Sequence, residues 1–175
     1  MPHTSEPPGN MGDMPPSAGD GYGGTSAHRR ISVVIADRRA SYRICLSQLV
    51  TATPDLRVAA ALADGTVAVR EALRLRPHVV IAATRLRGMS GVEVARCLRA
   101  LAPGTATLLL LERADEREVR IARDAGAVPL VLPDVDVLDI VGMVRALGQG
   151  RMLADAITAE VGAQAADRSP PAAHP

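Results

Sequence analysis

Lysine, phenylalanine and tryptophan do not occur anywhere in this chain of 175 residues. All 20 cationic side chains are therefore arginines, and no lysine amine is present at any position. Without large aromatics, the core has to be built from Val, Leu, Ile, Ala and Met. A formal net charge of +1 gives no electrostatic reason to expect nucleic acid or an anionic membrane as a partner.

Cysteine and long apolar runs are also scarce. The two cysteines, Cys45 and Cys97, lie in predicted helices without metal-ligand spacing, so we interpret them as small buried side chains in a reducing cytoplasm. No apolar run approaches the roughly 18 residues that a membrane span requires. The amino terminus is rich in Pro, Gly and Ser and does not resemble a signal peptide. These features predict a cytoplasmic protein without a membrane segment.

The sequence divides into three parts. Residues 1–30 are rich in Pro and Gly and poor in branched side chains, so they cannot bury enough apolar area to offset the entropy of ordering. Residues 31–150 alternate between apolar runs and amphipathic stretches, which predicts one folded domain. Residues 151–175 lose this periodicity and are interpreted as a mostly disordered extension. A length of about 120 residues suits a single domain.

Five repeats of a strand followed by a helix are predicted. The strands are residues 31–36, 56–62, 78–83, 107–111 and 128–132. Apolar spacing predicts inward stripes that include Leu73 on the second helix and Leu101 on the third. Asp134 or Asp136 is expected to cap the last helix, and Gly148 to end it. Such repeats imply a doubly wound α/β domain with right-handed crossovers.

The stretch from Arg76 to Gly91, RPHVVIAATRLRGMSG, resembles the third strand and following loop of response-regulator receiver domains. The pattern there is R-P-D-V-V-L-M-D-x-x-M-P-G-M-D-G, in which the second Asp accepts a phosphoryl group. The resemblance covers residues 31–150. It implies a flavodoxin-like (βα)5 three-layer sandwich with a parallel sheet in the order 2-1-3-4-5, and a site at the carboxyl ends of strands one and three.

Carried over by position, the resemblance implies a degenerate site. The first member of the acidic pair remains as Asp37, and the second is replaced by Arg38. The phosphoacceptor position is Ala83, whose methyl group has no nucleophilic oxygen. The hydroxyl position falls on Leu111 and the lysine position on Pro133. One carboxylate beside an arginine is a poor Mg²⁺ site, so no metal, no cofactor and no catalysis are expected. Asp37 is interpreted as a carboxylate that pairs with Arg38 or caps the first helix.

The remaining candidates have structural interpretations. His78 replaces an acidic residue of the pattern and is expected near the surface at the entry to a strand. Tyr42 is expected to pack against the domain. Five arginines on helix faces are interpreted as a solvated surface balanced by Glu71 and Glu93. They are Arg70, Arg74, Arg76, Arg96 and Arg99.

Three functional hypotheses follow. The first is a phosphorylation-independent signalling module that binds a protein partner. That partner is a histidine kinase, a DNA-binding subunit or a second copy of this chain, bound by the face of helix four, strand five and helix five. The second is a pseudo-receiver that senses a small molecule at the strand ends. The third is a receiver-only subunit of a transcription regulator, because about 25 residues after Gly150 are too few for a helix-turn-helix module.

Overall fold

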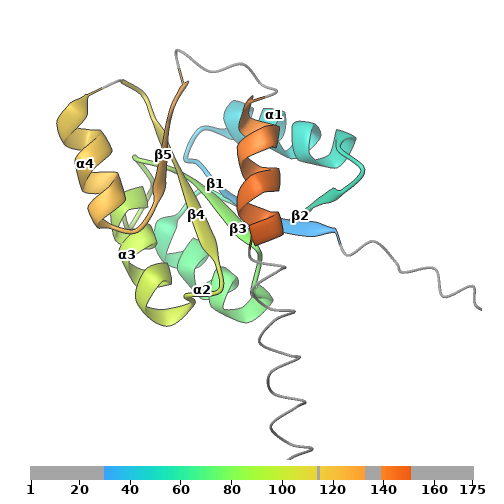
Figure 1. Cartoon of the computed structure of the whole chain (residues 1–175), viewed down its shortest axis with the longest axis horizontal. Coiled ribbons are helices and arrows are strands. Elements are labelled where there is room, and N and C mark those ends of the chain that lie inside the picture. Colours follow the sequence, from blue (N-terminus) through green and yellow to red (C-terminus); the bar gives the residue numbers. More distant parts are fainter. Residues whose placement is uncertain (1–29, 114, 133–138, 151–175) are drawn as a thin grey trace, which may run out of the picture.

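A single sheet with helices on both faces makes up the folded domain (Figure 1). A computed structural model describes residues 30–113, 115–132 and 139–150. The strands are β1 (Ile31–Ala36), β2 (Leu56–Leu62), β3 (Val79–Ala83), β4 (Ala106–Leu111) and β5 (Val128–Val131). The helices are α1 (Ala40–Ala52), α2 (Gly65–Leu75), α3 (Gly91–Leu101), α4 (Glu116–Asp124) and one over residues 139–150. The predicted strand bounds agree with these to within one residue.

The sheet has the predicted topology. Its five strands are parallel and stand in the order β2-β1-β3-β4-β5, as in the flavodoxin-like fold. Strands β1, β3 and β4 are buried on both faces, which explains why each is a continuous apolar run. The carboxyl ends of these three strands lie at one edge of the sheet, and their amino ends lie at the opposite edge.

Successive residues of the strands point to opposite faces of the sheet and form two separate hydrophobic cores. Val34, Val80 and Leu109 face α2, α3 and α4, where they pack in a core that includes Ala68, Val94 and Ala122. Val33, Ile81, Leu108 and their neighbours face α1 and the 139–150 helix, where they meet Leu46, Val50 and Val144. The result is a three-layer α/β/α sandwich, built from aliphatic side chains as the absence of Phe and Trp requires.

Helix starts are set by side chains that the sequence displays. The Asp64 carboxylate accepts hydrogen bonds from the backbone N–H groups of Thr66 and Val67 at the start of α2. Ser90 and Glu93 form a reciprocal capping box at the start of α3. These hydrogen bonds from Ser90 hold the pKa of the Glu93 carboxyl below its usual value. At the other end of a helix, Gly126 follows α4 with φ +86°, a left-handed conformation that suits glycine.

Two apolar side chains expected in the core lie outside it. Leu73 on α2 is 39% exposed, and Leu101 on α3 is 62% exposed. Both lie in the last turn of their helices, at the amino edge of the sheet, and neither packs against the two cores. Hydrophobic spacing reports the face of a helix, but it does not report where the sheet ends.

The predicted end of the last helix was wrong. The helix continues through Gly148 to residue 150. A Cβ atom at position 148 would collide with the side chain of Ile31, so glycine is required here by the close approach of the helix to β1. The predicted cap residues, Asp134 and Asp136, lie outside the described residues.

Cys45, which was expected to be buried, lies outside the buried face of α1. Leu46 and Val50 are buried, whereas Cys45 is exposed and Tyr42 is 40% exposed. Cys97 on α3 is only partly buried. The interpretation of Cys45 as a buried side chain was therefore wrong, because several overlapping stripes fit the sequence of α1. Cys97 packs against the core that α2, α3 and α4 cover, and Tyr42 packs against the side chain of Arg39. No described helix is long and apolar enough to cross a membrane.

Candidate functional site

Three strand ends converge at the carboxyl edge of the sheet. Asp37 directly follows β1, Ala83 is the last residue of β3, and Leu111 is the last residue of β4. The register pairs Ala36 with Ala82, and Ala83 with the penultimate residue of β4. The backbone N–H of Asp37 donates to the carbonyl of Leu62 at 3.0 Å, which holds this turn against the end of β2. The structure thus brings the predicted site residues Asp37, Ala83 and Leu111 to one edge.

The Asp37 carboxylate is fully buried and is held by Arg39. Its Oδ1 accepts hydrogen bonds from the backbone N–H of Arg39 at 2.8 Å and from Arg39 Nε at 3.1 Å. Its Oδ2 accepts from Arg39 Nη2 at 2.8 Å. Arg43 on α1 donates from Nη1 to the Asp37 carbonyl oxygen at 2.7 Å. Both carboxylate oxygens are thus bound by one guanidinium in a bidentate pair.

Two further side chains fix the guanidinium of Arg39. It lies over the ring of Tyr42, with 3.7 Å from Cζ to the ring centroid, and its Nη1 is 3.5 Å from Glu112 Oε1. The hydrogen bond to Asp37 raises the pKa of Arg39 above its ordinary value, although partial burial acts in the opposite direction. Arg39 therefore remains cationic at any physiological pH. We refer to Asp37, Arg39, Tyr42 and Glu112 as the strand-end cluster.

The predicted partner of Asp37 was wrong. Arg38 is exposed, and Arg39 forms the ion pair. The reason is an Asx turn, in which an aspartate side chain accepts the N–H of the residue two positions later and folds that residue back over its carboxylate. Asp37 also does not cap α1. The N-cap of that helix is Arg39, and it makes no side-chain capping hydrogen bond.

Apolar side chains occupy the carboxyl ends of β3 and β4. Ala83 is 5% exposed and Leu111 is fully buried. The carbonyl of Ala83 lies so close to Gly91 that a Cβ atom there would collide with it, which fixes the start of α3 against the end of β3. Pro133, the predicted lysine position, lies outside the described residues. In the described part of the chain, no three His, Cys, Asp or Glu side chains are grouped so that they could hold a metal ion.

His78 lies at the opposite, amino edge of the sheet and is buried. Its Nδ1 accepts a hydrogen bond from the backbone N–H of Ser32 at 3.0 Å, and the Ser32 hydroxyl is 2.7 Å from the same nitrogen. Because a backbone N–H can only donate, Nδ1 carries no proton and the ring proton is on Nε2. The expected structural role of His78 fits these contacts, but its expected place near the surface was wrong.

The helix-face arginines have several roles. Arg74 pairs with Glu71 at 2.6 Å, and Arg70 lies 3.8 Å from the same carboxylate. Arg99 donates to the carbonyl of Asp124 at 2.9 Å. Glu93 was expected to balance the charge of these arginines, but its carboxylate accepts hydrogen bonds from Ser90 in the capping box of α3.

Sequence comparison finds relatives among the response regulators. The chain is 26% identical over 124 residues to a nitrate/nitrite response regulator protein homolog of Haemophilus influenzae, which covers 71% of this chain and 60% of that protein. It is 28% identical over 120 residues to the response regulator VraR of Staphylococcus aureus, and 27% identical to the transcriptional regulatory protein LiaR of Bacillus subtilis. The latter two alignments cover 69% of this chain and 57% of each relative. No protein-family model matches the chain.

Solved structures agree on the fold. The signal receiver domain of the putative response regulator NarL from Mycobacterium tuberculosis superposes with a TM-score of 0.66 at 24% identity, covering 70% of this chain and 98% of that domain. The response regulator domain of Thermotoga maritima CheB gives a TM-score of 0.63 at 23% identity, with coverages of 69% and 98%.

Fold and sequence similarity together define the class. The chain has a flavodoxin-like α/β domain with the strand order β2-β1-β3-β4-β5, the fold of the solved receiver domains. In sequence the chain is similar to response regulators, and in fold it is similar to their receiver domains, including those of the NarL and LuxR type. It spans about 60% of the length of the curated relatives it matches.

Sequence reasoning missed three members of the strand-end cluster. Arg39 was identifiable in principle, because a residue two positions after a strand-end aspartate is the one that an Asx turn brings back. The contact of Tyr42 with Arg39 could then be expected, because Tyr42 lies three residues later and residues three apart are neighbours on a helix. Glu112 had no local signal, because its contact with Arg39 joins the ends of two different strands.

Proposed function

We propose that this chain is a phosphorylation-independent signalling module of the receiver type, which acts by binding a protein partner. The single observation that carries the proposal is the bidentate pair between Asp37 and Arg39. In a phosphorylated receiver, a metal ion would occupy the space beside this carboxylate. Here an arginine of the same chain supplies the positive charge permanently.

Electrostatics supports this proposal. Mg²⁺ is held by carboxylates and phosphate oxygens, and it gives up its water molecules reluctantly. At Asp37 it would have to displace a guanidinium that makes two hydrogen bonds to a buried carboxylate. With Ala83 at the end of β3, an incoming phosphoryl group would also find no nucleophilic oxygen at that position. The strand-end cluster therefore favours a permanent ion pair between Asp37 and Arg39, whose charges do not change with phosphorylation.

The partner surface that we propose consists of α4, β5 and the 139–150 helix. Strand β5 is an edge strand, and edge strands present unpaired backbone groups to other chains. Helix α4 buries only Ala122 and exposes charges of both signs, including Glu116, Arg117 and Arg120. Such a surface suits a charge-complementary partner: a histidine kinase, a DNA-binding subunit or a second copy of this chain.

The test of phosphorylation independence is an intact-mass measurement after incubation with acetyl phosphate and Mg²⁺. A receiver with a strand-end aspartate, treated in parallel, serves as the positive control. We expect no mass increase in this chain and an increase of one phosphoryl group in the control. A stoichiometric, base-labile phosphoryl adduct on this chain would overturn the proposal.

A second candidate is a receiver subunit of a transcription regulator. The observation that favours it is the similarity to LiaR, named a transcriptional regulatory protein, of which this chain covers 57%. DNA binding would then be supplied by a partner subunit. Purification of the tagged chain from its native cells, followed by mass spectrometry, should recover a helix-turn-helix protein in stoichiometric amount. Recovery of a kinase alone would favour the first candidate.

A further inference from the structure

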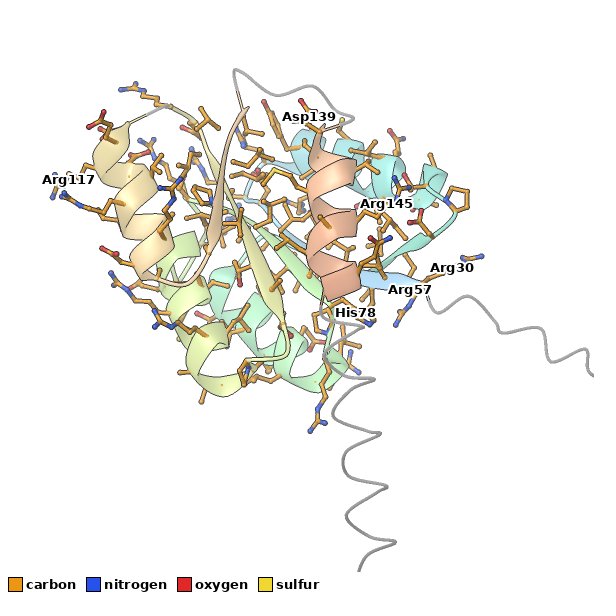
Figure 2. The ribbon with its side chains drawn as sticks, viewed as in Figure 1. Arg30, Arg57, His78, Arg117, Asp139 and Arg145 are labelled. Atoms are coloured by element: carbon orange, nitrogen blue, oxygen red, sulfur yellow. The ribbon has the colours of Figure 1, made fainter. Side chains whose placement is uncertain are left out.

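A cavity lies at the edge of the sheet opposite the strand-end cluster. It has a volume of about 900 Å³ and lies between the amino ends of the strands and the carboxyl ends of α2 and α3. We call it the amino-edge cavity. Its lining includes Arg30, Arg57, Arg76 and His78, together with Leu73 and Leu101. Figure 2 shows Arg30, Arg57 and His78 close to the start of β1, far from Arg117 on α4.

The charge of this lining is one-sided. Arg30, Arg57 and Arg76 contribute three positive charges, and the lining contains no carboxylate. Asp55, which directly precedes β2, is bound to Arg145 through two hydrogen bonds. The carboxyl ends of α2 and α3 each contribute about half a negative charge, which leaves an excess of about two positive charges at the cavity. Such an excess favours a ligand with two negative charges.

The walls also provide apolar surface. Leu73 and Leu101 remain exposed at the ends of their helices, and both line the cavity beside Leu75, Pro77 and Pro103. A binding site that combines apolar walls with a few charged groups suits an organic anion better than a bare inorganic ion. The volume lies within the range of about 300–1,000 Å³ that small-molecule sites occupy.

Hydrogen bonds hold the rim of the cavity in place. The Ser32 N–H donates to His78 Nδ1, and the Thr105 hydroxyl donates to the carbonyl of Pro77 at 2.8 Å. The Ala106 N–H donates to the carbonyl of His78 at 2.9 Å. Arg76 ends α2 in the left-handed region, at φ 46° and ψ 58°, a conformation that residues with a Cβ atom rarely adopt. The lining is thus a preformed part of the fold.

We propose that the amino-edge cavity binds a small organic phosphate ester that carries at least two negative charges. The guanidinium groups of Arg30, Arg57 and Arg76 supply the bidentate donors that phosphate oxygens accept. Leu73, Leu101 and the neighbouring prolines contact the organic part. The proposal concerns a different edge of the sheet from the strand-end cluster, so it stands independently of the function proposed above.

The test is calorimetric titration of the full chain with ADP, inorganic pyrophosphate and citrate as probes. ADP should bind saturably and more tightly than pyrophosphate or citrate, because only ADP has both phosphates and an organic body. Its affinity should fall when NaCl rises from about 50 mM to about 500 mM, because salt screens exposed charges. Amide chemical shifts on ADP addition should change around His78, Leu101 and Thr105, and not at Asp37.

Matched variants assign the binding to the cavity. R57Q and R30Q should each weaken ADP binding about tenfold, as expected when a charge-assisted hydrogen bond is lost. R117Q removes the same charge from α4 and should leave the affinity unchanged, and circular dichroism checks that all three variants are folded. No saturation by ADP up to about 10 mM would overturn the proposal, because a cavity with three arginines and apolar walls should bind ADP more tightly than that. An equal loss in R117Q, shifts confined to Asp37, or equal affinity for citrate would also overturn it.

Discussion

Replacing Arg39 with alanine tests whether the strand-end cluster stabilises the fold. The change removes Nε and Nη2, which donate to the two oxygens of Asp37 at 3.1 and 2.8 Å. The backbone N–H at position 39 remains and still donates to Oδ1. Oδ2 would lose its charged donor in a position where the Asp37 side chain is 0% exposed. The variant would thus leave a buried negative charge without its cation.

The size of the effect follows from burial. Breaking a buried ion pair by removing one partner costs about 3–5 kcal/mol. The Arg39 side chain is 29% exposed, so water can partly replace it, and we expect a loss of about 2–3 kcal/mol in the free energy of unfolding. For a domain of this size that corresponds to a fall of about 10 °C in Tm.

Urea denaturation at pH 7, followed by circular dichroism, measures this loss. R38A is the matched control, because Arg38 is the neighbouring residue, carries the same charge and is exposed. It should change the free energy of unfolding by less than about 0.5 kcal/mol. Adding Asp37→Ala to R39A should restore part of the loss, because the unpaired buried charge is then gone. Equal free energies of unfolding for R39A and R38A would refute the reasoning. A double variant that is less stable than R39A would also refute it, because removing the unpaired Asp37 carboxylate should then restore stability.

The remaining predictions concern other parts of the domain. A83D treated with beryllofluoride should show no large amide shifts on α4 or β5, because the strand-end cluster still holds its own cation; large shifts there would show an intact switch. G91A should lose about 1–3 kcal/mol in urea denaturation, because its Cβ would collide with the carbonyl of Ala83. G142A, which has nothing within 4 Å of its Cβ, should instead gain about 0.5–1 kcal/mol, and equal effects of the two would contradict the contact. The hydrogen bonds from Arg145 lower the pKa of Asp55 in the folded state. This ion pair therefore stabilises the fold at pH values above the unfolded-state pKa of about 3.9. The contribution is lost as the pH falls through the lower pKa of the folded state. D55N should therefore be less stable than the parent chain at pH 7, with a difference that narrows below about pH 4; a constant difference across this range would contradict the assignment.

The sequence alone determined the architecture and the residues at the strand ends. Continuous apolar runs such as Ile31–Ala36 identified buried parallel strands, because both faces of such strands are covered. A helix cap such as Asp64 has a local chemistry, because its carboxylate accepts from N–H groups only two and three residues later. The absence of an acidic side chain at Ala83 and the absence of lysine throughout the chain are properties of composition, so no structure was needed to find them.

Tertiary structure decided which side chains meet. The pairing of Asp37 with Arg39 depends on a turn conformation, and the contact of Arg39 with Glu112 joins segments more than 70 residues apart in the sequence. The exposure of Leu101 depends on where the sheet ends relative to α3, which helical periodicity cannot report. The amino-edge cavity likewise gathers residues from β1, β2 and the ends of two helices. Contacts between distant segments arise only when the strands align, and for that reason they carry no local signal in the sequence.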